Sequence, residues 1–79
     1  MDFVKGMVVR AKAGRDKGKF LVILETQGDY ALIADGRRRR VSHPKRKKLI
    51  HLAPTNTVHQ GSLETDPKIK QILRSFNGG

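Results

Sequence analysis

The apolar runs of this chain are short, and turn-forming residues follow them closely. The most apolar run is FLVIL at residues 20–24, which is too short for a helix and rich in residues that favour strands. A second run, YALIA at residues 30–34, follows the turn residues 27–29. The pattern predicts two strands joined by a tight turn, and we expect residues 20–24 to form the central strand of a sheet.

Further strands and one loop are predicted on either side of these two strands. Apolar and basic residues alternate over residues 7–13, which is the pattern of a half-buried strand. Residues 13–19 contain two glycines and have no periodicity, so we interpret them as a loop. The Asp35-Gly36 pair predicts a hairpin, with residues 37–41 as the returning strand.

The last part of the chain is expected to close the sheet and then to form a helix. After a proline break, residues 49–52 are predicted to be the closing strand and residues 53–65 a connector. Asp66 followed by Pro67 is typical of a helix start, with Asp66 as the N-cap. The helix is predicted over residues 67–76, and we expect its apolar stripe to pack on the same domain. The stripe consists of Ile69, Ile72, Leu73 and Phe76.

Five short strands in a chain of 79 residues predict a mostly β fold. The expected architecture is a small SH3-like barrel with a short C-terminal α-helix, because closure removes exposed sheet edges. An OB-like barrel is the alternative, although it usually needs a longer chain. We assign residues 1–54 to the barrel domain and residues 55–79 to the connector and helix. No signal peptide or membrane span is evident in the sequence, so we expect a cytoplasmic protein.

Basic residues dominate the charge of the chain. It carries 17 Lys and Arg residues against 7 Asp and Glu, which gives a formal net charge of +10. Eight of the twelve residues from 37 to 48 are basic, and none is acidic. Such a surface repels itself and a polyanion would relieve the repulsion, so nucleic acid is the first candidate partner. A membrane surface is disfavoured, because this run holds one bulky apolar residue, Val41.

Several enzymatic and metal-binding functions are excluded or disfavoured. The absence of cysteine excludes disulfides, thiolate zinc sites and thiol nucleophiles. The segment GRDKGK at residues 14–19 differs from a nucleotide-binding P-loop, because one residue is missing between its glycines and Phe20 stands where Ser or Thr would hold magnesium. His43, His51 and His59 are eight residues apart with no second ligand type nearby, so they predict no metal site. We expect neither an enzyme nor a bound cofactor.

Three aspartates lie at predicted turns, where local hydrogen bonding is expected of them: Asp16, Asp29 and Asp35.

The first half of the chain resembles a KOW motif. The resemblance covers about residues 6–54, and its most specific elements are Lys17-Gly18-Lys19 and the later stretch ALIADG. More narrowly, the chain resembles the KOW domain of ribosomal protein eL14 and its short bacterial relatives. KOW motifs of transcription elongation factors usually have another glycine where this chain has Phe20-Leu21. This departure favours the ribosomal branch.

The resemblance implies an SH3-like barrel that binds RNA, typically ribosomal RNA, through the loop between its first two strands and nearby basic residues. By position, this role falls on residues 14–19. Glycines let a backbone approach a phosphate closely, and Arg and Lys side chains supply hydrogen-bond donors. With the basic clusters added, the candidate RNA-binding residues are Arg10, Lys12, Gly14, Arg15, Lys17, Gly18, Lys19, Arg37, Arg38, Arg39, Arg40, Lys45, Arg46, Lys47 and Lys48.

The expected function is RNA binding, as a ribosomal component or an assembly factor. Aromatic residues are few; Tyr30 is the one candidate for stacking on a base, and packing at the core or its rim is its favoured alternative. We therefore expect folded RNA, such as large-subunit ribosomal RNA, to be held through its backbone and shape. Neighbouring ribosomal proteins are further expected partners, and the free protein is expected to be a monomer. The alternatives are a protein-interaction adaptor that uses the barrel or the helix face, and DNA binding.

Overall fold

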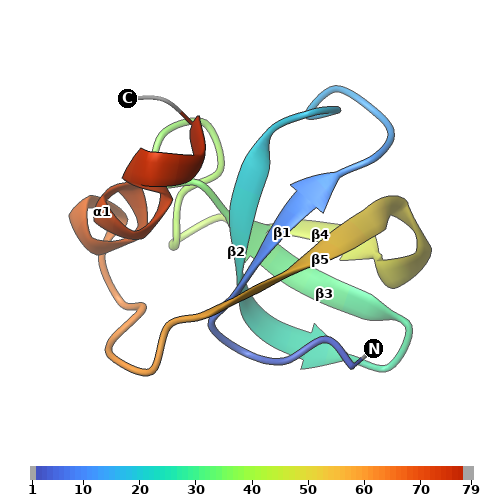
Figure 1. Ribbon diagram of the computed structural model, residues 1–79, viewed down its shortest axis with the longest axis horizontal. Coiled ribbons are helices and arrows are strands. Elements are labelled where there is room, and N and C mark those ends of the chain that lie inside the picture. The colour runs from blue at the N-terminus through green and yellow to red at the C-terminus, as the bar shows by residue number, and fades with distance from the viewer. Residues whose placement is uncertain (1, 78–79) are drawn as a thin grey trace.

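Five strands and one α-helix make up the part of the chain that the computed structural model describes, residues 2–77 (Figure 1). The strands form one antiparallel sheet in the order β4-β3-β2-β1-β5. The protein is therefore mostly β with a C-terminal helix, as the sequence predicts, and β2 is the central strand. The elements are β1 (Met7–Ala11), β2 (Phe20–Gln27), β3 (Tyr30–Ala34), β4 (Lys45–Lys48), a 3-10 helix (Leu49–His51), β5 (Leu52–Val58) and α1 (Asp66–Asn77).

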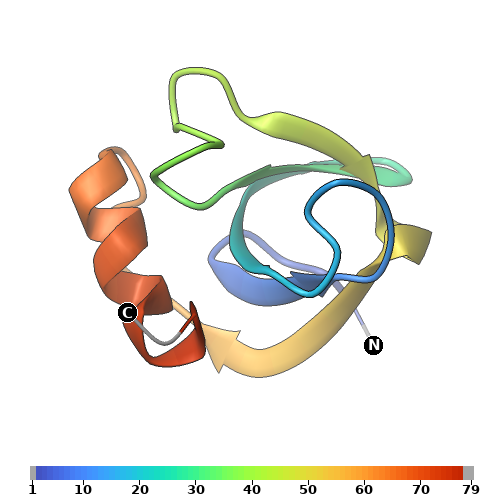
Figure 2. The ribbon, with the colours of Figure 1, turned by 90° about the horizontal axis from the view of Figure 1, so that it is seen from above.

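The sheet is strongly curled. Its two edge strands, β4 and β5, would lie about 19 Å apart in a flat sheet with a strand spacing of about 4.8 Å. Only the 3-10 helix Leu49–His51 joins them, and three such residues rise by about 6 Å. The edges must therefore approach each other at this corner, as Figure 2 shows. Within residues 2–77 no hydrogen-bonded ladder joins β4 to β5, so the sheet is not closed.

Two hydrophobic clusters cover the two faces of the sheet. The inner cluster fills the concave side and contains alternate residues of the strands, such as Val9, Leu21 and Ile33. The outer cluster joins Val8 and Val22 to α1. Strands β1 and β2 are thus buried on both faces, which explains why the run FLVIL is continuously apolar rather than alternating. The predicted packing of the helix stripe on its own domain is confirmed.

The helix begins one residue earlier than predicted, and a different residue caps it. The Thr65 hydroxyl accepts a hydrogen bond from the Lys68 N–H at 3.3 Å, which is the interaction of an N-cap. Asp66 is the first helical residue, and its Oδ1 instead accepts the Val41 N–H at 2.8 Å. The prediction of Asp66 as the N-cap was wrong, because its carboxylate satisfies a donor of a distant loop.

The predicted returning strand at residues 37–41 is also wrong. Asp35 Oδ1 accepts the N–H groups of both Arg37 and Arg39 at 2.8 Å, which folds this segment into a tight turn. On the side away from β2, β3 pairs with β4, and Ile33 lies opposite Lys45. The basic run from residue 37 to 48 is therefore divided between a loop and an edge strand.

The closing strand lies later in the chain than residues 49–52. Residues Leu49–His51 form the 3-10 helix, and β5 runs from Leu52 to Val58 through part of the predicted connector. Pro54 is tolerated because β5 is an edge strand. Next to it, the Thr55 hydroxyl donates to the Val8 carbonyl at 2.6 Å. Strand β1 ends at Ala11 rather than at residue 13, and β2 extends to Gln27 rather than ending at residue 24.

Candidate nucleic-acid interface

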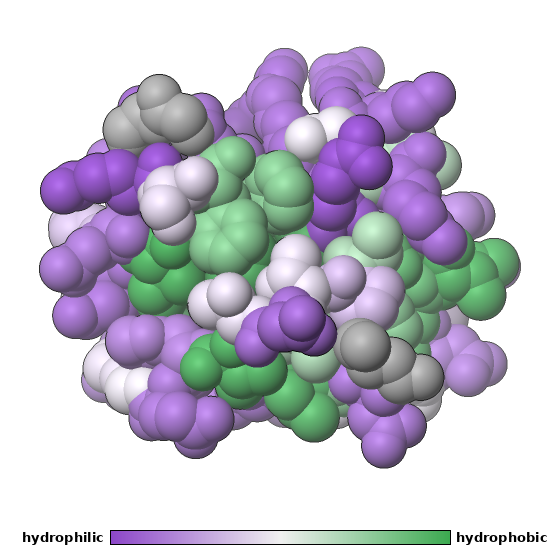
Figure 3. Space-filling view, in the orientation of Figure 1, coloured by the Kyte–Doolittle hydropathy of each residue, from purple (hydrophilic) through white to green (hydrophobic). Residues whose placement is uncertain are grey.

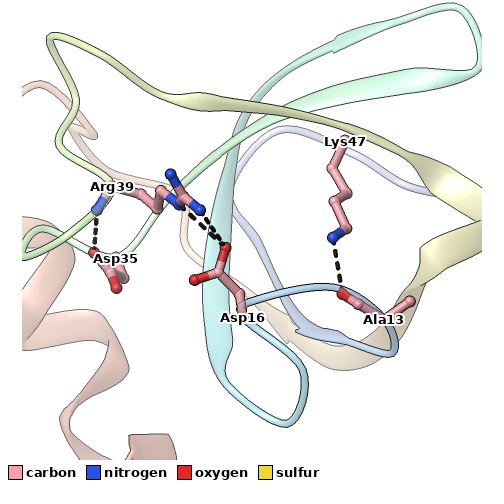
Figure 4. A network of polar contacts seen from close by, with 5 residues as sticks. All are labelled: Ala13, Asp16, Asp35, Arg39 and Lys47. Atoms are coloured by element: carbon pink, nitrogen blue, oxygen red, sulfur yellow. Dashed lines mark hydrogen bonds and ion pairs between the residues drawn. The ribbon is translucent and has the colours of Figure 1, made fainter.

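Three basic segments that are separate in the sequence lie against one another in the structure. They are the β1–β2 loop (residues 12–19), the β3–β4 loop (residues 35–44) and β4. Arg39 donates from both Nε and Nη2 to Asp16 Oδ2 at 3.1 Å, which joins the two loops. Lys47 Nζ donates to the Ala13 carbonyl at 2.8 Å, which joins β4 to the β1–β2 loop (Figure 4). We call these three segments the basic surface.

Asp16 is a structural residue that the sequence analysis assigned to local turn bonding. Its side chain is buried, and a buried carboxylate needs a charged or hydrogen-bonding partner. Arg39 supplies that partner, although Asp16 Oδ1 has no hydrogen-bond partner within residues 2–77. One sequence signal pointed to this role, namely an acidic residue placed alone inside a basic loop. Arg39 thereby acts as a positioning residue for the basic surface.

Lys47 has a similar positioning role. Strand alternation places it on the concave side of the sheet, opposite Ala31, and its side chain is half-buried. It reaches from β4 across to the β1–β2 loop (Figure 4). A Cβ at Gly14 would lie 2.7 Å from Lys47 Nζ, so the glycine leaves room for this contact. Gly14 also has a φ of 82°, which side chains disfavour.

Gly18 is required by its backbone conformation rather than by crowding. Its φ is 88°, and no atom lies within 4 Å of the place that a Cβ would take. Its N–H donates to the Ala11 carbonyl at 2.8 Å, and the Ala11 N–H donates to the Lys19 carbonyl at 2.9 Å. These bonds close the loop at the end of β1. The open space around Gly18 leaves the loop backbone accessible.

Most of the remaining predicted residues are exposed on the basic surface. Arg46 is exposed on the outward side of β4, and its guanidinium lies 3.6 Å from the centroid of the Tyr30 ring. This cation–π contact covers one face of Tyr30, which is half-buried. Arg10 is set apart from the loops. Side chains alternate along β1, so Arg10 lies on the same face as Val8, which is the face that α1 covers. The exposed cations of the basic surface are Lys12, Arg15, Lys17, Lys19, Arg37, Arg38, Arg40, Lys45, Arg46 and Lys48.

Two further cations, Lys70 and Arg74, lie close to this surface and were not among the predicted site residues. They line a pocket of about 440 Å³ together with residues of both basic loops. The sequence analysis assigned their helix to packing, and its apolar stripe does pack on the sheet. The signal for a second role was their spacing of four residues, which places both on one side of a helix.

The outer surface of α1 and the sheet is largely hydrophilic. In the view of Figure 3, an apolar area lies over the seam between α1 and β2, and hydrophilic residues surround it. At this seam the rings of Phe20 and Phe76 pack with centroids 5.2 Å apart. The helix stripe is therefore engaged within the molecule. Exposed large apolar side chains among the described residues are Val4 and Ile50.

The described residues contain neither a cluster of metal ligands nor a helix that could span a membrane. Within residues 2–77 no three His, Asp or Glu side chains cluster as metal ligands would. The α-helix of this same range is too short and too polar to cross a bilayer. Comparison of the chain with protein-family models and with curated proteins found no match.

Proposed function

We propose that this protein binds folded RNA, with ribosomal RNA as its natural target, by neutralising backbone phosphates along the basic surface. One observation carries the proposal. The chain has 17 basic residues, yet the described residues form one ion pair, Asp16–Arg39. The exposed cations of the basic surface therefore have no acidic partner among residues 2–77, and a polyanion would supply that partner.

The aromatic residues favour recognition through the RNA backbone rather than through stacked bases. Phe20 and Phe76 pack against each other at the helix–sheet seam. Arg46 already occupies one face of the Tyr30 ring. A protein that stacks successive bases needs an exposed aromatic platform, so these contacts argue for phosphate and shape recognition.

The resemblance to the KOW family points to the same function. We propose that the curled sheet is an open SH3-like barrel, and three features support this: the strand order, the strong curl, and the 3-10 helix between β4 and β5. The family resemblance places RNA binding in the loop between the first two strands. In this protein the β1–β2 loop carries Arg15, Lys17 and Lys19, all of them exposed.

Sedimentation of a cell lysate on sucrose gradients tests the ribosomal part of this proposal. An antibody follows the protein across the subunit fractions at low and at high salt. We expect it in the large-subunit fractions at low salt. Retention through a high-salt wash would identify an integral component, and release would identify a peripheral factor. A protein that stays at the top of the low-salt gradient would overturn the ribosomal assignment.

A further inference from the structure

The pocket beside α1 is lined mostly by cations from three different elements. Lys19 comes from the end of the β1–β2 loop, Arg37 from the β3–β4 loop, and Lys70 and Arg74 from α1. We call it the helix pocket. Its volume of about 440 Å³ is in the range of small-ligand sites. The remaining lining residues are Asp35, Leu73 and Asn77.

One carboxylate stands against the four cations of the lining, which leaves the lining with a net charge of +3. Asp35 is the one carboxylate in the lining, and its Oδ1 accepts two backbone N–H groups of the β3–β4 loop at 2.8 Å. Asn77 accepts the Phe20 N–H through Oδ1 and donates to the Phe20 carbonyl through Nδ2, both at 3.1 Å. None of the four cations forms an ion pair with a carboxylate of residues 2–77.

Lys70 and Arg74 lie four residues apart on the helix, so their like charges repel each other. Asp66, four residues before Lys70, and the helix C-terminus near Arg74 offset part of this repulsion. The stem of Lys70 lies close to the β3–β4 loop. Its Cγ is 2.9 Å from the position that a Cβ on Gly36 would take. Both cations are exposed, so they are accessible to a ligand. A phosphate between the helix and the loops would offset this repulsion.

We propose that the helix pocket binds a phosphate of the RNA backbone, so that the RNA-binding surface continues from the basic loops onto α1. This inference rests on the proposed function. The lining offers a phosphate four cations and one apolar side chain, Leu73, so charge dominates its recognition. Each polar atom of the Asn77 amide already makes one hydrogen bond to the backbone of Phe20.

Two double variants of equal charge test the proposal. K70Q/R74Q removes the two helix cations of the pocket. K5Q/K68Q removes two cations that do not line it and serves as the matched control. Binding of a fluorescein-labelled RNA hairpin to each full-length protein is measured by anisotropy over a range of salt concentrations. If the two helix cations hold the one phosphate of the pocket, the slope of log K against log salt should become shallower by about 0.8 in K70Q/R74Q and stay unchanged in the control.

Further arms separate a binding role from a structural one. K70R/R74K keeps both charges and should retain the wild-type slope. The melting temperature of K70Q/R74Q should stay close to that of the wild type, because the lost repulsion is balanced by the lost attraction of Arg74 to the helix C-terminus. Two results together would overturn the proposal in favour of a structural role. They are a lower melting temperature of K70Q/R74Q and a salt slope of K70R/R74K that stays below the wild-type slope.

The remaining outcomes distinguish this inference from the proposed function. Equal slopes in K70Q/R74Q and the control, with wild type binding RNA, would overturn the pocket and leave RNA binding in place. Absence of RNA binding by wild type at low salt would overturn both. Titration of wild type with AMP and with inorganic phosphate, followed by amide chemical shifts, tests the ligand source. Tight binding of either at pocket residues, with an unchanged RNA slope, would assign the pocket to a free phosphate compound instead.

Discussion

At the residue scale, the ion pair between Asp16 and Arg39 determines how the two basic loops lie relative to each other. Asp16 is 1% exposed, and both donors of Arg39 reach a single carboxylate oxygen at 3.1 Å. The Asp16 carbonyl also accepts the Lys19 N–H at 2.9 Å within the loop. A buried ion pair adds little to the free energy of unfolding compared with apolar packing at the same place. Loss of one partner, however, leaves the other charge buried without a hydrogen bond.

A double-mutant cycle measures this dependence. Asp16→Ala is expected to lower the free energy of unfolding by about 2 kcal/mol, since Arg39 then loses two charged hydrogen bonds. The Arg39 side chain is 23% exposed, so water compensates part of the loss and the cost stays below that of a fully buried pair. Urea unfolding of D16A, R39A and D16A/R39A should show a coupling energy of about 1 kcal/mol or more. Additive effects would contradict the structural role of the pair.

Neighbouring arginines are expected to behave differently when each is replaced by glutamine. Arg38 is exposed and forms no ion pair among the described residues, so Arg38→Gln should weaken RNA binding and leave the melting temperature unchanged. Arg39 is half-buried against Asp16, so Arg39→Gln should lower the melting temperature. Thermal unfolding and RNA anisotropy of both variants check this contrast. A stability loss in R38Q equal to that in R39Q would show that the ion pair does not distinguish them.

At the element scale, α1 is attached to the β3–β4 loop at its start and to β2 at its end. Near its start, Asp66 accepts the Val41 N–H at 2.8 Å. At its end, Asn77 makes two hydrogen bonds to the backbone of Phe20, at the first position of β2. Between these points Ile69 and Leu73 are buried against the sheet. A 12-residue helix is marginal alone, so these contacts hold it in place.

Asn77 can be tested without disturbing the apolar packing. Asn77→Ala is expected to lower the free energy of unfolding by about 1 kcal/mol, because it removes two exposed hydrogen bonds. Ser75→Ala is the control, since Ser75 is exposed on the same helix and its hydroxyl forms no hydrogen bond to residues 2–77. Urea unfolding measures both. Equal stability of N77A and wild type would show that the apolar contacts alone position the helix end.

The elements with strong periodicity were predictable from the sequence. Strands β2 and β3 were located by their apolar runs, and α1 was located by its stripe, because burial of these residues dominates local structure. The predicted strand at residues 37–41 does not form, because the Asp35 carboxylate accepts the N–H groups of Arg37 and Arg39. A two-residue turn pattern does not reveal these hydrogen bonds. The closing strand was predicted too early, at residues 49–52, because the edge strand β5 contains Pro54 and mostly polar residues, which do not give a strand pattern.

The candidate site was predictable in composition but not in detail. The basic segments stand out in the sequence, and the structure places the loops and β4 together. No pattern in the sequence indicates that Arg39 and Lys47 form contacts within the protein. The separation of Arg10 from the loops, and the place of Lys70 and Arg74 beside them, are equally absent from the sequence pattern. These distinctions depend on long-range contacts, such as Asp16 with Arg39, that no local pattern encodes.

At the scale of the whole molecule, ten positive charges remain after all seven acidic residues are counted. The net charge of +10 is spread over a chain whose described part has a radius of gyration of 10.9 Å. That repulsion opposes compaction, and two hydrophobic clusters overcome it. We therefore expect RNA to raise the melting temperature of the protein, because a ligand that binds the folded state stabilises it.

The most direct test of the central claim is the salt dependence of RNA binding by the wild-type protein. A labelled fragment of large-subunit ribosomal RNA is titrated at several salt concentrations, and a DNA duplex serves as the competitor. If the exposed cations neutralise several phosphates, affinity should fall by at least about tenfold between about 50 and 200 mM salt, and RNA should be preferred over the duplex. An affinity that does not change with salt, or no binding at the lowest salt, would contradict the account.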